Sequence, residues 1–122
     1  MNKIVIQGIL PDLNKVINLT KKHWAIYYRE KKQWTHLCAY FAKSSLLRID
    51  EFPIKIRIVW HIKNNRKDFD NIVFAKKYIL DGLVLAKIIP DDTLRYVRGF
   101  EDILGSTNNR NPYTEVFLLP IT

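Results

Sequence analysis

The sequence predicts a single domain of the α+β class, in which a mixed β-sheet is packed by two main helices. Short segments rich in β-branched residues alternate along the chain with longer segments of helical periodicity. Their order, strand–helix–strand–helix–strand–strand, is typical of a mixed sheet covered by helices. The chain has the size of one domain, and no repeat or linker divides it, so we expect residues 1–122 to form one unit.

The first half of the chain is predicted to begin with a strand and continue into a long helix. Residues 3–10 are short and β-branched, which is typical of a strand. Residues 12–22 fit either a loop or a short helical turn. Residues 24–48 contain no glycine or proline, and their apolar side chains recur at spacings of three and four. This pattern predicts a helix that is either continuous or interrupted around residues 30–33.

The second half is predicted to contain three strands and one helix. Residues 54–62 alternate between apolar and mostly polar side chains, which predicts a half-buried strand. Residues 70–86 read as a helix with Asp70 as its N-cap. Residues 93–100 and 114–119 are predicted to be the last two strands, separated by a flexible turn.

The charge of the chain predicts a polyanionic partner. It holds 20 lysines and arginines against 12 acidic residues, a net charge of +8, which favours nucleic acid. No apolar run approaches the roughly 18 residues that would span a bilayer, and no signal peptide is recognisable. A single cysteine cannot form an internal disulfide. We therefore expect a cytoplasmic protein without a membrane partner.

Five of the twelve acidic residues lie in one short segment of this basic chain. They are Asp68, Asp70, Asp81, Asp91 and Asp92. Taken singly, Asp70 fits a helix cap and Asp91–Asp92 an ordinary turn. If the fold brings the two pairs together, however, their oxygens would suit Mg²⁺, which prefers carboxylate, water and phosphate ligands. A metal ion amid lysines and arginines is suited to cutting phosphodiesters.

Helix geometry adds a lysine to this candidate site. At about 100° per residue, Lys77 and Asp81 fall within about 20° of Asp70 on a helix over residues 70–86. The rest of that helix is almost wholly apolar, which predicts a buried helix with one ionic line. A simple Lys77–Asp81 surface pair is the alternative. Lys76 falls in the apolar arc and is the weaker candidate.

Three short motifs in residues 66–98 resemble the RusA family of Holliday junction resolvases. They are Lys67-Asp68-Phe69-Asp70-Asn71, Lys77 with Asp81-Gly82-Leu83, and Ile89-Pro90-Asp91-Asp92. The resemblance is looser in residues 10–14 and 54–62. The segment from Asp70 to Lys77 is longer here than in the enterobacterial members of the family.

The resemblance implies a small, phage-derived, homodimeric endonuclease. Such an enzyme resolves four-way DNA junctions by paired symmetric nicks, in recombination and repair, in a bacterial or phage-infected cell. It implies Asp68, Asp70 and Asp92 as ligands of Mg²⁺ or Mn²⁺, with Asp91 as the alternative to Asp92. Lys77 corresponds to the catalytic lysine, with Lys76 as its alternative. No small-molecule cofactor is implied.

Basic residues are expected to hold the DNA. Lys63, Arg66 and Lys67 precede the Asp-x-Asp motif and would cradle the backbone. A further set would extend the positive surface: Lys21, Lys22, Arg29, Lys31 and Lys32. A competing hypothesis is a non-catalytic or differently targeted dimer of the same fold that binds branched DNA.

Overall fold

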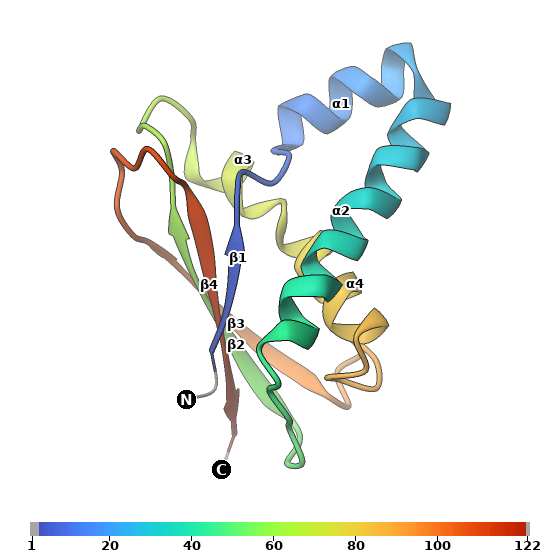
Figure 1. The fold of residues 1–122 in the computed structure, drawn as a ribbon, viewed down its shortest axis with the longest axis vertical. Coiled ribbons are helices and arrows are strands. Elements are labelled where there is room, and N and C mark those ends of the chain that lie inside the picture. The colour runs from blue at the N-terminus through green and yellow to red at the C-terminus, as the bar shows by residue number, and fades with distance from the viewer. Residues whose placement is uncertain (1–2, 122) are drawn as a thin grey trace.

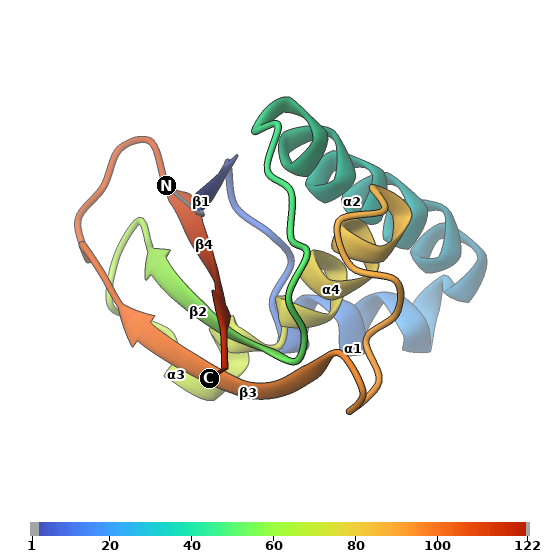
Figure 2. The same ribbon diagram turned by 90° about the horizontal axis from the view of Figure 1, so that it is seen from below.

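A four-stranded mixed sheet forms one layer of the molecule, and the helices lie over one of its faces (Figures 1 and 2). The computed structural model describes residues 3–121. The strands are β1 (Lys3–Gln7), β2 (Ile54–His61), β3 (Val97–Leu104) and β4 (Tyr113–Pro120), in the spatial order β1-β4-β2-β3. β4 pairs antiparallel with β1 and β2, whereas β2 and β3 are parallel. The α+β class is confirmed.

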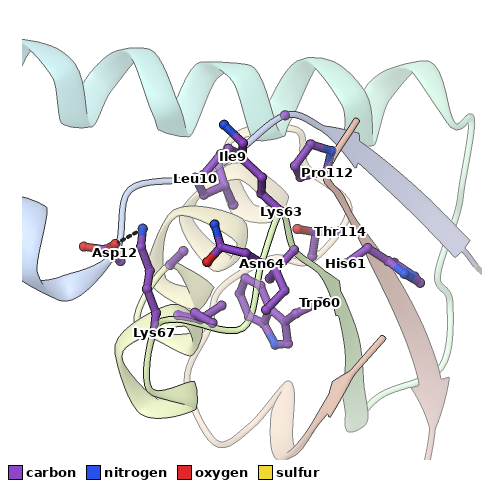
Figure 3. A pocket seen from close by; sticks show the side chains of 14 residues that line it. Ile9, Leu10, Asp12, Trp60, His61, Lys63, Asn64, Lys67, Pro112 and Thr114 are labelled. Carbon is purple, nitrogen blue, oxygen red and sulfur yellow. Dashed lines mark hydrogen bonds and ion pairs between the residues drawn. The ribbon is translucent and has the colours of Figure 1, made fainter. Parts of the chain in front are cut away.

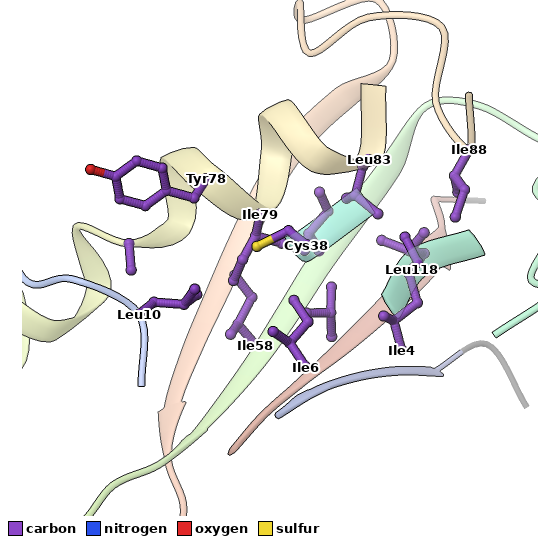
Figure 4. Packing of buried hydrophobic residues seen from close by; sticks show 14 of the residues in the cluster. Ile4, Ile6, Leu10, Cys38, Ile58, Tyr78, Ile79, Leu83, Ile88 and Leu118 are labelled. Carbon is purple, nitrogen blue, oxygen red and sulfur yellow. The ribbon is translucent and has the colours of Figure 1, made fainter. Parts of the chain in front are cut away.

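The central strand β2 shows why one face of the sheet is covered. Ile54, Ile56 and Ile58 are fully buried, and the side chains between them are only half-buried. The alternation predicted from the sequence is therefore confirmed. The buried side chains pack with those of β1, β4 and the helices into one core (Figure 4).

Four helices accompany the sheet. They are α1 (Leu13–Lys22), α2 (Trp24–Ser44), α3 (Phe69–Val73) and α4 (Lys76–Leu85). The long helix α2 is continuous. Residues 12–22, which fitted either a loop or a short helical turn, contain helix α1. α1 and the first turns of α2 project beyond the end of the sheet (Figure 1). Among residues 3–121, no helix has both the length and the apolar character needed to span a bilayer.

The close packing of α4 against α2 depends on a glycine. A Cβ atom at Gly82 would stand 2.6 Å from the Cβ of Cys38 and 3.0 Å from the backbone nitrogen of Ala39. These separations are shorter than van der Waals contact, so only glycine lets the two helix backbones approach this closely.

The prediction of one continuous helix over residues 70–86 is wrong. The backbone tightens between α3 and α4, where Ala75, Lys77 and Tyr78 each donate to the carbonyl three residues earlier. Such bonds belong to a 3₁₀ turn, in which the rotation and the rise per residue are both larger than in an α-helix. Asp70 and Lys77 consequently do not share the continuous α-helical line that the sequence predicted.

Each strand differs from the sequence prediction in at least one boundary, and the largest shifts are in β1 and in β3, which ends at Leu104 rather than at residue 100. The predicted strand over 93–100 begins only at Val97, because the Thr93 carbonyl accepts the N–H groups of Tyr96 and Val97 and forms a turn. The first strand ends at Gln7 rather than at residue 10, because Gly8 has a φ of 99° and turns the chain away.

Replacing Gly82 by alanine is expected to destabilise the fold. Overpacking at this contact should outweigh the gain in helix propensity and lower the free energy of unfolding by about 1–2 kcal/mol. Urea denaturation measures the change. Gly99→Ala is the matched control, because its Cβ would meet only the flexible Lys55 side chain at 3.4 Å; we expect a change below about 0.5 kcal/mol. Equal effects at both glycines would contradict the packing argument.

Candidate active site

Only four of the twelve acidic residues form a salt bridge within residues 3–121. Every salt bridge among residues 3–121 uses one of four acids: Asp12, Glu101, Asp102 or Glu115. The other eight form none, and five of these eight are the aspartates between residues 68 and 92. In a protein with 20 lysines and arginines, this leaves a local group of carboxylates whose charge no neighbouring cation neutralises.

Asp68 and Asp70 lie at the start of α3, and both are exposed. The N-cap position belongs to Asp68, so the prediction that Asp70 caps the helix is wrong. The Asp68 side chain makes no capping hydrogen bond, although its backbone carbonyl accepts the N–H of Asn71 at 3.1 Å. One oxygen of Asp70 accepts the N–H of Asn71 at 2.9 Å. Both side chains thus keep oxygens free for a ligand.

Two contacts tie this acidic segment to the beginning of α1. On one side of it, Lys67 forms an ion pair with Asp12, which is almost fully buried. On the other side, the Asn71 amide oxygen accepts the backbone N–H of Asn14 at 3.0 Å. The Asp-x-Asp motif is therefore held from both ends, although it lies in an exposed part of the chain.

The second acidic pair, Asp91 and Asp92, follows α4, and the two side chains have different surroundings. One oxygen of Asp91 accepts the N–H of Asp92 at 2.8 Å. Asp92 lines an open concavity together with Lys77 and Asp81. The walls of this concavity also include Val73, so it reaches the end of α3. Asp92, and not Asp91, therefore shares this concavity with Lys77.

The carboxylates do not gather into a preformed metal centre. Across residues 3–121, no group of three or more histidine, cysteine or acidic side chains is close enough to hold one ion. The donor chemistry nevertheless fits, because Asp68, Asp70 and Asp92 are exposed carboxylates without cationic partners, and Mg²⁺ prefers such oxygens. The metal site stays a prediction.

The two neighbouring lysines of α4 have different environments. Lys76 Nζ lies 2.6 Å from Asp102 Oδ2 and 4.5 Å from the centre of the Phe100 ring. The other oxygen of Asp102 accepts the indole N–H of Trp60 at 3.1 Å. Lys77 is exposed and forms no ion pair with any described residue. Lys76 thus attaches α4 to β3, whereas Lys77 has no such attachment among the described residues.

The predicted DNA-binding residues lie in two regions. Lys63, Arg66 and Lys67 occupy the loop between β2 and α3, next to the acidic segment. The others lie at the end of α1 and on the first half of α2, and all but one are exposed: Lys21, Lys22, Arg29, Lys31 and Lys32. Lys31 is half-buried.

The sequence interpretation missed a pocket beside this loop. Its volume is about 130 Å³, and its lining includes Leu10, Trp60, Asn64 and Thr114 (Figure 3). These residues come from separate parts of the chain and show no common spacing. Only the alternation of β2, which assigned Trp60 to the buried face, carried a partial signal.

The comparisons with known proteins leave the family open. No protein-family model matches the sequence, and no curated protein matches it either. The resemblance to the RusA family therefore depends on the motif residues of the acidic segment and on α4.

The Asp12–Lys67 ion pair should make stability depend on pH. Burial alone would raise the pKa of Asp12, but the hydrogen bonds from Lys67 and the Lys15 backbone N–H outweigh it and lower the pKa below the ordinary 3.8. A lowered folded-state pKa stabilises the protein above the unfolded-state pKa, and this stabilisation disappears as pH falls through the folded value. Asp12→Asn, which keeps the helix cap, should therefore cost about 1 kcal/mol at pH 7 and almost nothing at the lowest pH.

Urea denaturation between pH 7 and pH 2 measures this difference. Asp50→Asn is the control, because Asp50 is exposed and has no ion pair among the described residues. A cost at Asp12 that does not shrink as the pH falls would contradict the ion-pair interpretation.

Proposed function

We propose that the protein is a metal-dependent, structure-specific DNA endonuclease that resolves four-way junctions by paired nicks. The observation that carries this proposal is the group of unpaired aspartates in a chain of net charge +8. A divalent ion requires carboxylates that are not already paired. A phosphate backbone requires basic residues beside them.

The proposed ligands are Asp68, Asp70 and Asp92, holding Mg²⁺ or Mn²⁺. When bound, the ion would act as a Lewis acid toward water and the scissile phosphate. Lys77, exposed in the same concavity as Asp92, would stabilise the negative charge that grows on the phosphate in the transition state. This role does not require Lys77 to give up its proton.

Other contacts would position these groups. The Lys76–Asp102–Trp60 chain fastens the start of α4 to the sheet. The Asp12–Lys67 and Asn14–Asn71 contacts hold the Asp-x-Asp segment. The basic residues of the loop before α3, and those of α1 and α2, would bind phosphates on either side of the cut.

A resolvase of this kind would act as a homodimer. Two symmetric nicks across a junction need two symmetric sites, and a two-fold axis supplies them. The resemblance to the RusA family supports the same assembly and a role in recombination and repair in a bacterial or phage-infected cell.

Cleavage of a synthetic four-way junction tests the proposal directly. We expect symmetric nicks in the junction with Mg²⁺, none with EDTA, and none in linear duplex. Asp70→Asn should lower the cleavage rate by at least about 100-fold. It should leave junction affinity unchanged or raise it, because one negative charge facing the phosphates is removed. Asp50→Asn is the matched control and should cut normally.

Two outcomes would contradict the proposal in different ways. If Asp70→Asn cuts at the normal rate, the assignment of the site is wrong. If the unmodified protein binds the junction but cuts it with neither Mg²⁺ nor Mn²⁺, the non-catalytic DNA-binding dimer is the better interpretation.

Alanine variants of the two lysines should separate catalysis from positioning. Lys77→Ala should lower the cleavage rate about 100-fold with little effect on stability. Lys76→Ala should lower the free energy of unfolding by about 1–2 kcal/mol, because Asp102 loses its partner in a mostly buried place. Single-turnover cleavage and urea denaturation measure the two effects. The roles would be exchanged if Lys76→Ala alone lost cleavage while remaining fully stable.

A further inference from the structure

The pocket between the end of β2 and α3 has mostly apolar walls, and two of its polar side chains, Asn64 and Thr114, keep hydrogen-bonding groups that the fold leaves unused (Figure 3). Leu10, Trp60 and Ile72 form much of its wall. A pocket that is mostly apolar, with a few placed polar groups, is the usual form of a site for a small ring system.

The Asn64 amide and the Thr114 hydroxyl can each still form a hydrogen bond with a ligand. The Asn64 side-chain oxygen accepts the backbone N–H of Arg66 at 3.1 Å, which orients the amide. Its NH₂ group then has no acceptor among the described residues. Thr114 is only 5% exposed, yet its hydroxyl has no hydrogen-bond partner among residues 3–121. One oriented donor and one adaptable hydroxyl therefore line a mostly apolar space.

The size of the pocket restricts its occupant. A cavity of about 150 Å³ in another protein accepts one benzene ring, and this pocket measures about 130 Å³. One six-membered ring therefore matches this volume better than the fused rings of a purine do. The ring must also be able to exchange hydrogen bonds with an amide and a hydroxyl.

The charged side chains of the lining are Lys63, Lys67 and Asp12, and Asp12 forms an ion pair with Lys67. Lys63 and Lys67 both line the pocket, and both are exposed. Lys67 donates to Asp12, but an ammonium group has three protons and can reach a phosphate as well. A ring attached to a phosphate chain would therefore find cations beside the pocket.

The pocket also adjoins the candidate active site along the chain. Two lining residues, Lys67 and Ile72, flank the Asp68–Asp70 segment. A strand bound there would have one base in the pocket and a neighbouring phosphate near the aspartates. Bases at a branch or mismatch are the cheapest to unstack.

We propose that this pocket receives one unstacked pyrimidine base of a DNA strand, with its phosphates on Lys63 and Lys67. The inference deepens the proposed function, because it assumes that DNA is the substrate. Asn64 and Thr114 would read the edge of the base, and Trp60 would form an apolar wall beside it.

Direct binding of mononucleotides to the full-length protein tests this inference without cleavage. Deoxycytidine and thymidine 5′-monophosphates should cause saturable NMR shifts at the Asn64 side-chain amide and at Thr114. Deoxyadenosine 5′-monophosphate should bind at least about tenfold more weakly, and inorganic phosphate should shift only the rim lysines. Asn64→Leu should weaken pyrimidine binding about tenfold, the effect of one lost hydrogen bond.

Two further variants test whether nucleotide binding depends on the pocket. Thr114→Val keeps the shape of a residue in β4 while removing its hydroxyl, and it should also weaken binding. Asn18→Leu, at an exposed site on α1 outside the pocket lining, should bind normally.

Three results would overturn the inference. These are the absence of shifts at the pocket, equal shifts with phosphate alone, and equal binding of purine and pyrimidine nucleotides. Junction cleavage without nucleotide binding would reject the pocket and leave the proposed function standing. Specific nucleotide binding without cleavage would reject the nuclease and keep the pocket.

Discussion

The burial of one face of β2 is the constraint on which the rest of the structure depends. This strand lies between β4 and β3, and three of its isoleucines are completely buried against the helical layer. Burying a side chain of this size contributes about 1.5–3 kcal/mol. Because the strand cannot slip without exposing that face, its end is fixed, and so is the start of the basic loop that leads to the acidic segment.

The candidate site combines a rigid support with unneutralised charge. Ion pairs and hydrogen bonds hold the residues on both sides of Asp68 and Asp70, yet the two carboxylates themselves remain open. Leaving like charges unpaired in one region costs stability, since they repel each other. In the proposed function, a bound divalent cation would relieve this repulsion.

Several elements were predictable from local pattern, and others were not. The alternation of residues 54–62 identified β2, and the absence of glycine and proline identified α2. The break between α3 and α4 was not predictable, because no proline or glycine marks it; Ala75 and Tyr78 are each 1% exposed, and a 3₁₀ turn carries them into the core. β3 starts late because Thr93 begins a turn. The composition of residues 93–96 is typical of a strand and does not indicate this turn.

By itself, the sequence determined the fold class, the basic surface and the identity of the acidic residues, because these follow from composition and from short-range periodicity. Only the tertiary structure decided that Lys76 is bound to Asp102 while Lys77 is free, and that Asp92 rather than Asp91 shares its concavity. It also brought Asn64 and Thr114 to one pocket beside Trp60. Such choices depend on contacts between residues distant in the chain, and no local pattern records them.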